Sequence, residues 1–558
     1  MAPTMPLDDI KPGMQGTAYT VVDNSGIIKP FYVSIIGTID NGKGATPYIL
    51  ARANGDLIEQ TKGVLQGMSG SPVYINGKLI GALSAGFKEN DPNVFLITPI
   101  DNMLNIWNYK EVIAPETESE TETKNESKTE TESEDEIDDE TENKSEEIIE
   151  TESETEDKAN FIYNGFNLDS LKEIGFKDLS IGATTAPKIN YESDIQGGSA
   201  VAVAAVIGDF TVGATGTVTL VDEEKLLAFG HGFTSAGNVN FFLAEASVIG
   251  SVTGNNGMKV ASVGPVIGTV NQDRNVGIGG IIGKFPATVP VNVDVNGDKY
   301  SAIMAYNENL TAGLGAAIAY SALNKSTDSS ANGTVKVEFD IKTDIVEGGT
   351  LSRENTYYSD SDVGKLAVGE LLQALNIVST NTTTESNIYG IDVRMKYETL
   401  RKTASLISAK ADKVVKPGQE VVLNVKLQPY RAEAIDLKIP YTVPVTAAPG
   451  AFVVDIHGGG LVPVLQVQNA NVIMPSTKSP SEAYTEKIQQ LLNANKNNEL
   501  IIKPSTVVKT EKQLKAEIKR LAKLSKRGIK PVALKPTKFA TDYVVDNVIQ
   551  CTINVEKN

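Results

Sequence analysis

The sequence has little of the residues that most often build disulfides, metal sites and redox centres. It holds one cysteine, Cys551, two histidines and one tryptophan among 558 residues. A single cysteine excludes an intramolecular disulfide, and with only two histidines it does not supply the ligand set of a zinc site. No motif for a nucleotide or flavin is evident either, so we expect no cofactor.

Long apolar runs are missing as well. No stretch approaches the roughly 20 apolar residues that cross a bilayer, and the first residues, MAPTMPLDDIKPGM, lack the architecture of a signal peptide. The protein is therefore either cytosolic or an exported protein from which a signal has been removed. We expect the second, a secreted or cell-surface protein.

The chain also lacks a basic surface. Its formal charge is −19, but residues 114–158 hold 21 acidic and 4 basic residues and so contribute −17 of it. The remainder is close to neutral, which leaves no footprint for a nucleic acid. The acidic segment cannot bury enough apolar surface to offset its ordering entropy, and we expect it to be a disordered linker.

What the chain does hold is many short β-rich runs separated by glycine, asparagine and aspartate. They predict a mainly β fold with two barrels, and Asn76-Gly77 predicts a two-residue hairpin in the first. Asp362 and Ser479 are expected to cap later helices. The expected domains are a barrel over residues 1–113, the linker over 114–158, a second barrel over 159–345, a helix with an immunoglobulin-like β-sandwich over 346–470, and an α+β region over 471–558.

Ser69 lies in the stretch Gly67-Met68-Ser69-Gly70-Ser71-Pro72. Double-barrel serine proteases carry G-x-S-G-x-P at the nucleophile, because glycines on both sides let the chain turn sharply and let backbone N–H groups converge on an oxyanion. We expect Ser69 to be the nucleophile. The N–H groups of Gly67 and Ser69 are the expected oxyanion-hole donors.

The residues around this turn also predict a substrate pocket. Ser84 and Gly86, in LIGALSAG, occupy the places of a pocket wall in trypsin-like enzymes, and Gly63 lies where an acidic pocket base would select lysine or arginine. A small or apolar residue before the scissile bond is therefore expected. Met68 replaces the aspartate that trypsin-like enzymes use for zymogen activation, so activation by a new N-terminus is not expected.

A serine nucleophile needs a general base within hydrogen-bond reach. His231 follows an apolar strand and a glycine in LLAFGHGF, which suits a side chain that projects from a barrel rim. His457 lies in the later sandwich-like region, and a structural role is expected for it. His231 is the predicted base.

The third member of a triad is an acidic residue that orients the imidazole. Asp273 lies 42 residues after His231 in the same barrel, although its neighbour Arg274 offers it a structural ion pair instead. Asp209 and Asp56 are rivals. A pair of Ser69 and His231 assisted by a backbone carbonyl or a water is a further alternative.

Two segments, GVLQGMSGSPVYINGKLIGAL at 63–83 and GTVTLVDEEKLLAFGHGF at 216–233, resemble the SpoIVB-type serine peptidases of the chymotrypsin-like clan. The resemblance implies a chymotrypsin-like double β-barrel with Ser69 as nucleophile and His231 as base. The order is swapped relative to the sporulation enzymes, no PDZ domain is evident, and Asn54 stands at the position of their proposed aspartate. It is closer to the larger exported members that share the swapped order.

Two functions follow from these features. The first is a serine endopeptidase that cuts a protein or peptide substrate, its own chain included, in regulatory proteolysis at the cell envelope. The second is a non-catalytic envelope or adhesion protein that retains a peptidase-like double barrel.

Overall fold

The computed structural model is mainly β, with 49% of the described residues in strands and 19% in helices, as the sequence predicts. The structure describes residues 3–87, 91–109, 160–177, 179–184, 188–254, 257–329, 331–381, 386–461, 479–505, 511–528 and 535–556. The linker expected over 114–158 lies outside these residues. Within them, no helix combines the length and the apolar character needed to span a membrane.

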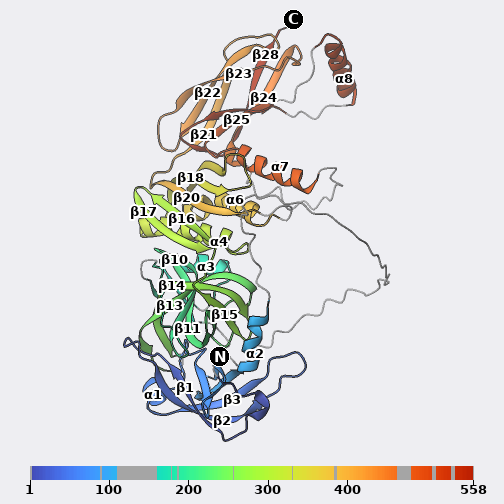
Figure 1. Cartoon of the computed structure of the whole chain (residues 1–558). Helices are drawn as coiled ribbons and strands as arrows, with labels where there is room; N and C mark the ends of the chain where they lie inside the picture. The colour runs from blue at the N-terminus through green and yellow to red at the C-terminus, as the bar shows by residue number, and fades with distance from the viewer. Residues whose placement is uncertain are drawn as a thin grey trace, which may run out of the picture.

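The first barrel is a closed ring of six antiparallel strands in the order β1-β2-β3-β6-β5-β4 (Figure 1). Asn76 and Gly77 both have positive φ and form the predicted tight turn between β4 and β5. The strands are β1 (Gln15–Thr20), β2 (Lys29–Ile39), β3 (Tyr48–Asn54), β4 (Pro72–Ile75), β5 (Lys78–Phe87) and β6 (Asp91–Pro99). The short helices are η1 (Leu7–Asp9), α1 (Asp56–Thr61), α2 (Ile100–Leu104) and η2 (Asn105–Asn108).

A second ring of six strands follows, because β10, β13, β14, β15, β12 and β11 pair in that order and β11 pairs back onto β10. Its strands are β10 (Ala200–Gly208), β11 (Thr211–Asp222), β12 (Lys225–Ala228), β13 (Gly237–Val252), β14 (Met258–Arg274) and β15 (Gly277–Ile282). Its side is extended by β7 (Asn160–Asn164), α3 (Leu168–Glu173), β8 (Ser180–Ile181) and β9 (Ala183–Thr184). The double barrel with the serine barrel first in the chain is thereby confirmed.

The two barrels pack directly against each other (Figure 1). Helix α2 and the turn η2, which leave the first barrel, place Ile100, Met103 and Ile106 in one buried cluster with Leu220 and Leu227 of the second. Burial of these apolar side chains from both barrels stabilises the docked arrangement.

Residues 283–345, which the sequence analysis groups with the second barrel, extend its sheet beyond the ring. Strand β17 pairs with β10, and the sheet continues through β16, β20, β18 and β19. Three helices cover it, and Asp362 caps the first turn of α5 as predicted. The elements are β16 (Thr288–Val295), β17 (Asp298–Ala305), α4 (Thr311–Thr327), β18 (Gly333–Thr343), β19 (Thr350–Ser359), α5 (Val363–Ala367), α6 (Gly369–Ser379) and β20 (Ile388–Glu398).

The C-terminal part consists of two four-stranded sheets, β23-β22-β21-β27 and β26-β25-β24-β28, that enclose a shared apolar core. Ser479 forms the expected capping box with Glu482 at the start of α7. The elements are β21 (Thr403–Ala411), β22 (Glu420–Pro429), β23 (Ile435–Thr442), β24 (Gly450–Gly458), η3 (Gly459–Leu461), α7 (Pro480–Asn493), β25 (Glu499–Pro504), α8 (Glu511–Lys526), β26 (Thr537–Ala540), β27 (Val544–Val545) and β28 (Val548–Val555).

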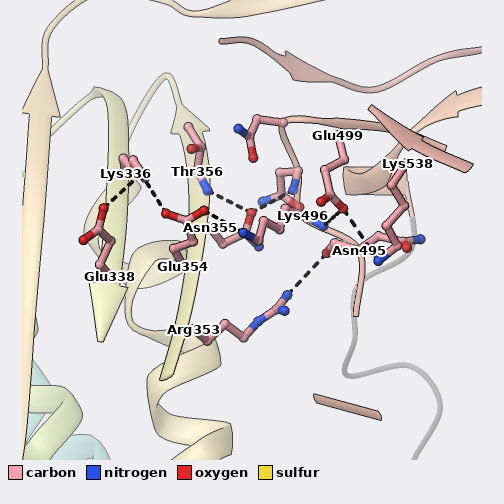
Figure 2. A network of polar contacts seen from close by, with 12 residues as sticks. Lys336, Glu338, Arg353, Glu354, Asn355, Thr356, Asn495, Lys496, Glu499 and Lys538 are labelled. Carbon is pink, nitrogen blue, oxygen red and sulfur yellow. Dashed lines mark hydrogen bonds and ion pairs between the residues drawn. The ribbon is translucent and has the colours of Figure 1, made fainter. Parts of the chain in front are cut away.

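A polar network joins this sandwich to the middle sheet (Figure 2). The carboxylate of Glu354 on β19 pairs with Lys336 at 2.7 Å and with Lys496 at 2.6 Å, and these two cations lower its pKa to about 2. Arg353 forms a buried two-pronged pair with Glu370 on α6 and also donates to the carbonyl of Asn495. The barrels thus lie at one end of the molecule, and the sandwich is attached at the other (Figure 1).

Candidate active site

Ser69 lies on a tight turn between α1 and β4, and it is half-buried. Gly67 and Gly70 lie on either side of it with φ of +86° and +95°. Residues other than glycine adopt this left-handed backbone conformation only at an energetic cost. The carbonyl of Met68 accepts hydrogen bonds from the N–H of Ser71 at 2.9 Å and from its hydroxyl at 2.6 Å. The turn that the glycine pattern predicts is therefore present and internally braced.

Strand β11 of the second barrel holds the other carbonyls of this turn. Thr217 donates from its N–H to the carbonyl of Ser69 at 2.8 Å and from its hydroxyl to the carbonyl of Gly67 at 3.0 Å. The hydroxyl of Thr219 donates to the carbonyl of Gly70 at 2.8 Å. A Cβ at Gly70 would lie 1.9 Å from the carbonyl oxygen of Thr217, so the close docking requires glycine there.

The N–H groups of Gly67 and Ser69 donate to no acceptor in the described part of the chain, whereas their neighbours are engaged. Met68 N–H bonds to the carbonyl of Leu65 at 3.0 Å, and Gly70 N–H bonds to that of Leu83 at 2.6 Å. Two unused donors on either side of a used one match what an oxyanion hole needs.

His231 approaches the serine turn from the second barrel. It follows β12 through Phe229 and Gly230, which have φ of +70° and +72°. A Cβ at Gly230 would lie 2.9 Å from the carbonyl oxygen of Leu83, the same oxygen that accepts the N–H of Gly70. Gly70, next to Ser69, and Gly230, next to His231, therefore both approach the carbonyl oxygen of Leu83. The docked barrels thus bring the two predicted catalytic residues into the same interface.

The histidine ring is oriented by a backbone carbonyl. Its Nδ1 lies 2.7 Å from the carbonyl oxygen of Gly232, and because a carbonyl can only accept, Nδ1 carries the proton. In the neutral ring this leaves Nε2 as the basic nitrogen, the tautomer that a general base for serine requires. His231 is 3% exposed, so little solvent competes for the ring.

Asp273, the predicted third member, is fully buried and braces the loop after His231. Its oxygens accept the N–H of Phe233 at 2.6 Å and both the N–H and hydroxyl of Thr234 at 2.7 and 2.8 Å. In the described part of the chain its hydrogen bonds go to this loop and not to the imidazole. The carbonyl of Gly232 contacts the imidazole, and Asp273 braces the loop that contains this carbonyl.

The other candidates lie in different surroundings. Asp209 accepts the N–H of Ser301 at 2.7 Å, and Asp56 is exposed in the first turn of α1. Arg274 bonds to Gln272 and Asn238, and its guanidinium stacks on a tyrosine ring. His457 lies on β24 in the C-terminal sandwich, away from the barrels.

The Ser69 hydroxyl donates to the carbonyl of Ser84 at 3.2 Å. In this conformation the hydroxyl proton is held by a backbone carbonyl oxygen. Attack by Ser69 requires that this bond be exchanged for one to His231.

The predicted pocket residues lie together, but side chains fill the space between them. A Cβ added at Gly63 would lie 2.5 Å from the Cβ of Pro92, and a Cβ added at Gly86 would lie 3.4 Å from a methyl group of Val64. Ser84 is buried and bonds to the carbonyl of Leu96. The space beside Gly63 and Gly86 is therefore largely filled.

A larger cavity, about 880 Å³, opens beside His231. Aromatic and aliphatic side chains, Phe161, Phe176, Phe233 and Leu310, line it together with several asparagines. Its walls come from segments far apart in the sequence, among them the loop before β3, the loop after α3 and the loop before α4. No local pattern identifies such a cavity from the sequence.

Sequence reasoning also missed three residues that hold the serine turn. Thr217 and Thr219 stand in the stretch GTVTLV, where they resemble ordinary strand residues, and Lys259 is the second residue of β14. Their side chains are buried. The alternation of polar residues at 217 and 219 inside an apolar strand was the one available signal. Among the described residues, no cluster of histidine, cysteine, aspartate or glutamate forms a candidate metal site.

Comparison with known proteins gives one match. Residues 4–104 match the family model described as SpoIVB peptidase S55. No curated protein and no solved structure matches the chain. The matched range contains the whole first barrel with the Ser69 turn, and the second barrel supplies the histidine loop described above. The match supports a SpoIVB-type serine peptidase, a hydrolase, over the barrel that carries Ser69.

Proposed function

We propose that the protein is an endopeptidase in which Ser69 is the nucleophile and His231 the general base. His231 Nε2 takes the hydroxyl proton as Ser69 Oγ attacks the scissile carbonyl carbon, and the carbonyl oxygen becomes an oxyanion. The protonated imidazole then gives its proton to the leaving amine as the C–N bond breaks. Water, deprotonated by the same nitrogen, hydrolyses the acyl-enzyme and restores the serine.

The observation that carries this proposal is the pair of unused N–H groups at Gly67 and Ser69. Such donors stabilise charge that develops on a carbonyl oxygen, and loss of one costs about 100- to 1000-fold in rate in serine proteases. The Nδ1–H tautomer of His231 supports the same chemistry, because it leaves Nε2 free of a proton.

The substrate class that fits is an extended segment of a protein with a small residue before the scissile bond and apolar side chains nearby. The little space left beside Gly63 and Gly86 supports a small residue before the scissile bond. The cavity beside His231 supports apolar side chains nearby. A site with such narrow requirements suits regulatory cleavage, and we propose the cell envelope as its place.

A serine-directed probe tests the proposal. A fluorophosphonate should label intact protein at Ser69, as identified by mass spectrometry of the adduct, and the Ser69→Ala and His231→Ala variants should lose the label. Both variants should melt near the wild-type temperature. Labelling that persists in folded Ser69→Ala would refute the assignment.

One observation favours a second function, a binding protein that retains the barrels without the activity. The Ser69 hydroxyl donates to the carbonyl of Ser84 instead of the imidazole. If that bond is permanent, wild-type protein will resist the probe although it is folded, whereas an active enzyme will react.

A further inference from the structure

Lys259 is a fully buried lysine at the junction of the two barrels. It lies on β14 and is 1% exposed. Its Nζ donates to the hydroxyl of Thr217 on β11 at 3.1 Å and to that of Thr20, at the end of β1, at 3.4 Å. The two hydroxyls are themselves 3.3 Å apart. One amino group therefore contacts a strand of each barrel.

A chain of hydrogen bonds connects Lys259 to the serine turn. Because the Thr217 hydroxyl accepts from Lys259, its own proton goes to the carbonyl of Gly67 at 3.0 Å. The ammonium form can only donate, and the neutral amine keeps two N–H donors, so Lys259 can donate to Thr217 in both forms. Burial lowers the pKa of Lys259 to about 7.

The backbone of Lys259 makes a second contact with the same turn. Its N–H donates to the carbonyl of Gln66 at 3.0 Å, and Gln66 N–H donates to Gly257 at 2.9 Å. The Gln66 carbonyl and the Gly67 N–H belong to one planar peptide unit, so fixing the oxygen fixes the direction of the hydrogen. Lys259 thus acts on both peptide units that adjoin Gly67, one directly and one through Thr217.

We infer that Lys259 is a positioning residue of the oxyanion hole, which sets the Gly67 N–H through its backbone and through the Thr217 hydroxyl. This inference rests on the proposed function. The ammonium group does not reach the substrate, and its effect is on the geometry of a donor that stabilises the transition state. Because it also bonds to Thr20, docking of the barrels and alignment of the oxyanion hole become one event.

The test uses the full chain and a fluorophosphonate, with the labelling rate resolved into kinact and KI. Lys259→Met keeps the volume and removes the donor. Thr217→Val removes the hydroxyl, and Thr217→Ser is its matched control because it keeps Oγ. Displacement of one oxyanion donor should lower kinact by about tenfold or more in Lys259→Met and Thr217→Val, with little change in KI. Thr217→Ser should stay near wild type, and the double variant should lose no more than the worse single variant.

A wild-type kinact in Lys259→Met, or equal losses in Thr217→Val and Thr217→Ser, would overturn the inference. If Lys259→Met does not fold, the two Thr217 variants still decide. Multiplicative losses in the double variant would also contradict it, since they would mean that the lysine does not act through the hydroxyl. Failure of the proposed function looks different, because wild-type protein would then resist the probe or the label would survive in Ser69→Ala.

Discussion

Replacing Gly70 by alanine should separate the serine turn from the second barrel. The added Cβ would lie 1.9 Å from the carbonyl oxygen of Thr217 and 2.5 Å from the nitrogen of Phe229, and both are backbone atoms that no rotamer change can move. The positive φ adds strain of about 1–2 kcal/mol. Overpacking adds about 1–3 kcal/mol, and loss of two hydrogen bonds across the interface adds about 1 kcal/mol each.

Gly77→Ala is the matched control. Gly77 belongs to the same barrel and also has a positive φ, +74°, but a Cβ there would meet nothing within 4 Å. It therefore carries the backbone strain without the clash. The free energy of unfolding should fall by about 3–5 kcal/mol more in Gly70→Ala than in Gly77→Ala, as measured by urea unfolding.

The labelling rate provides the second measurement. Gly77→Ala should react with a fluorophosphonate at the wild-type rate, whereas Gly70→Ala should react at least about 100-fold more slowly, because displacement of the turn misaligns the oxyanion donors. Equal stability of the two variants together with equal labelling would refute the reasoning, since it would mean that the close approach of Gly70 and Thr217 is not required.

Three further predictions concern buried charges. Asp273→Asn should lower the labelling rate at least about tenfold while leaving the Ser69 turn intact, because the loop that orients His231 loses charged acceptors for its N–H groups; unchanged labelling would contradict this role. Glu370→Gln should lower the free energy of unfolding by about 3–5 kcal/mol in urea titrations, since it leaves the guanidinium of Arg353 buried without its counter-charge. The pKa of Lys259 is about 7 when folded and 10.5 ordinarily, so between those values the unfolded chain binds a proton that the folded chain does not. Stability should therefore rise with pH across that window, by up to about tenfold in the unfolding constant per pH unit, and Lys259→Met should lack this dependence.

The parts of the site that follow from local chemistry could be predicted from the sequence. Glycines at 67 and 70 and the pair Asn76-Gly77 impose backbone conformations by themselves, so the serine turn and its hairpin are readable in the chain. The orientation of His231 could not be read in the same way. Its partner is the carbonyl of the next residue, and every residue has a carbonyl.

The helix α4 shows why part of the fold was not predictable. Its sequence, TAGLGAAIAYSALNKST, is apolar on almost every side, and twelve of its residues are buried. A helix covered all round has no polar face, and so its sequence lacks the alternation that distinguishes a surface helix from a strand. No helix is therefore predicted here, within the barrel expected over residues 159–345. Only the packing against α6 and β16 specifies the helix.

The stretch GTVTLV acquires a physical meaning from the docked barrels. Gly216 admits the ring of Phe229, whose atoms would lie 2.5 Å from a Cβ, and Thr217 and Thr219 bind three carbonyls of a turn about 150 positions earlier. Residue types that look like ordinary strand formers are therefore constrained by a surface on the other barrel. The sequence of this strand alone does not show why these residue types are needed, because the contacts that require them come from the first barrel.

The family match and the catalytic unit have different boundaries. Residues 4–104 form a closed barrel with its own apolar core, and they include Ser69 and both unused N–H groups. Contacts that fix those groups come from β11 and β14 of the second barrel, which also supplies His231. The first barrel folded alone would then carry Ser69, but the N–H groups of Gly67 and Ser69 would lack the contacts that fix their direction. Chain order places no constraint on this arrangement, because the requirement is that the two surfaces dock, and either barrel can come first.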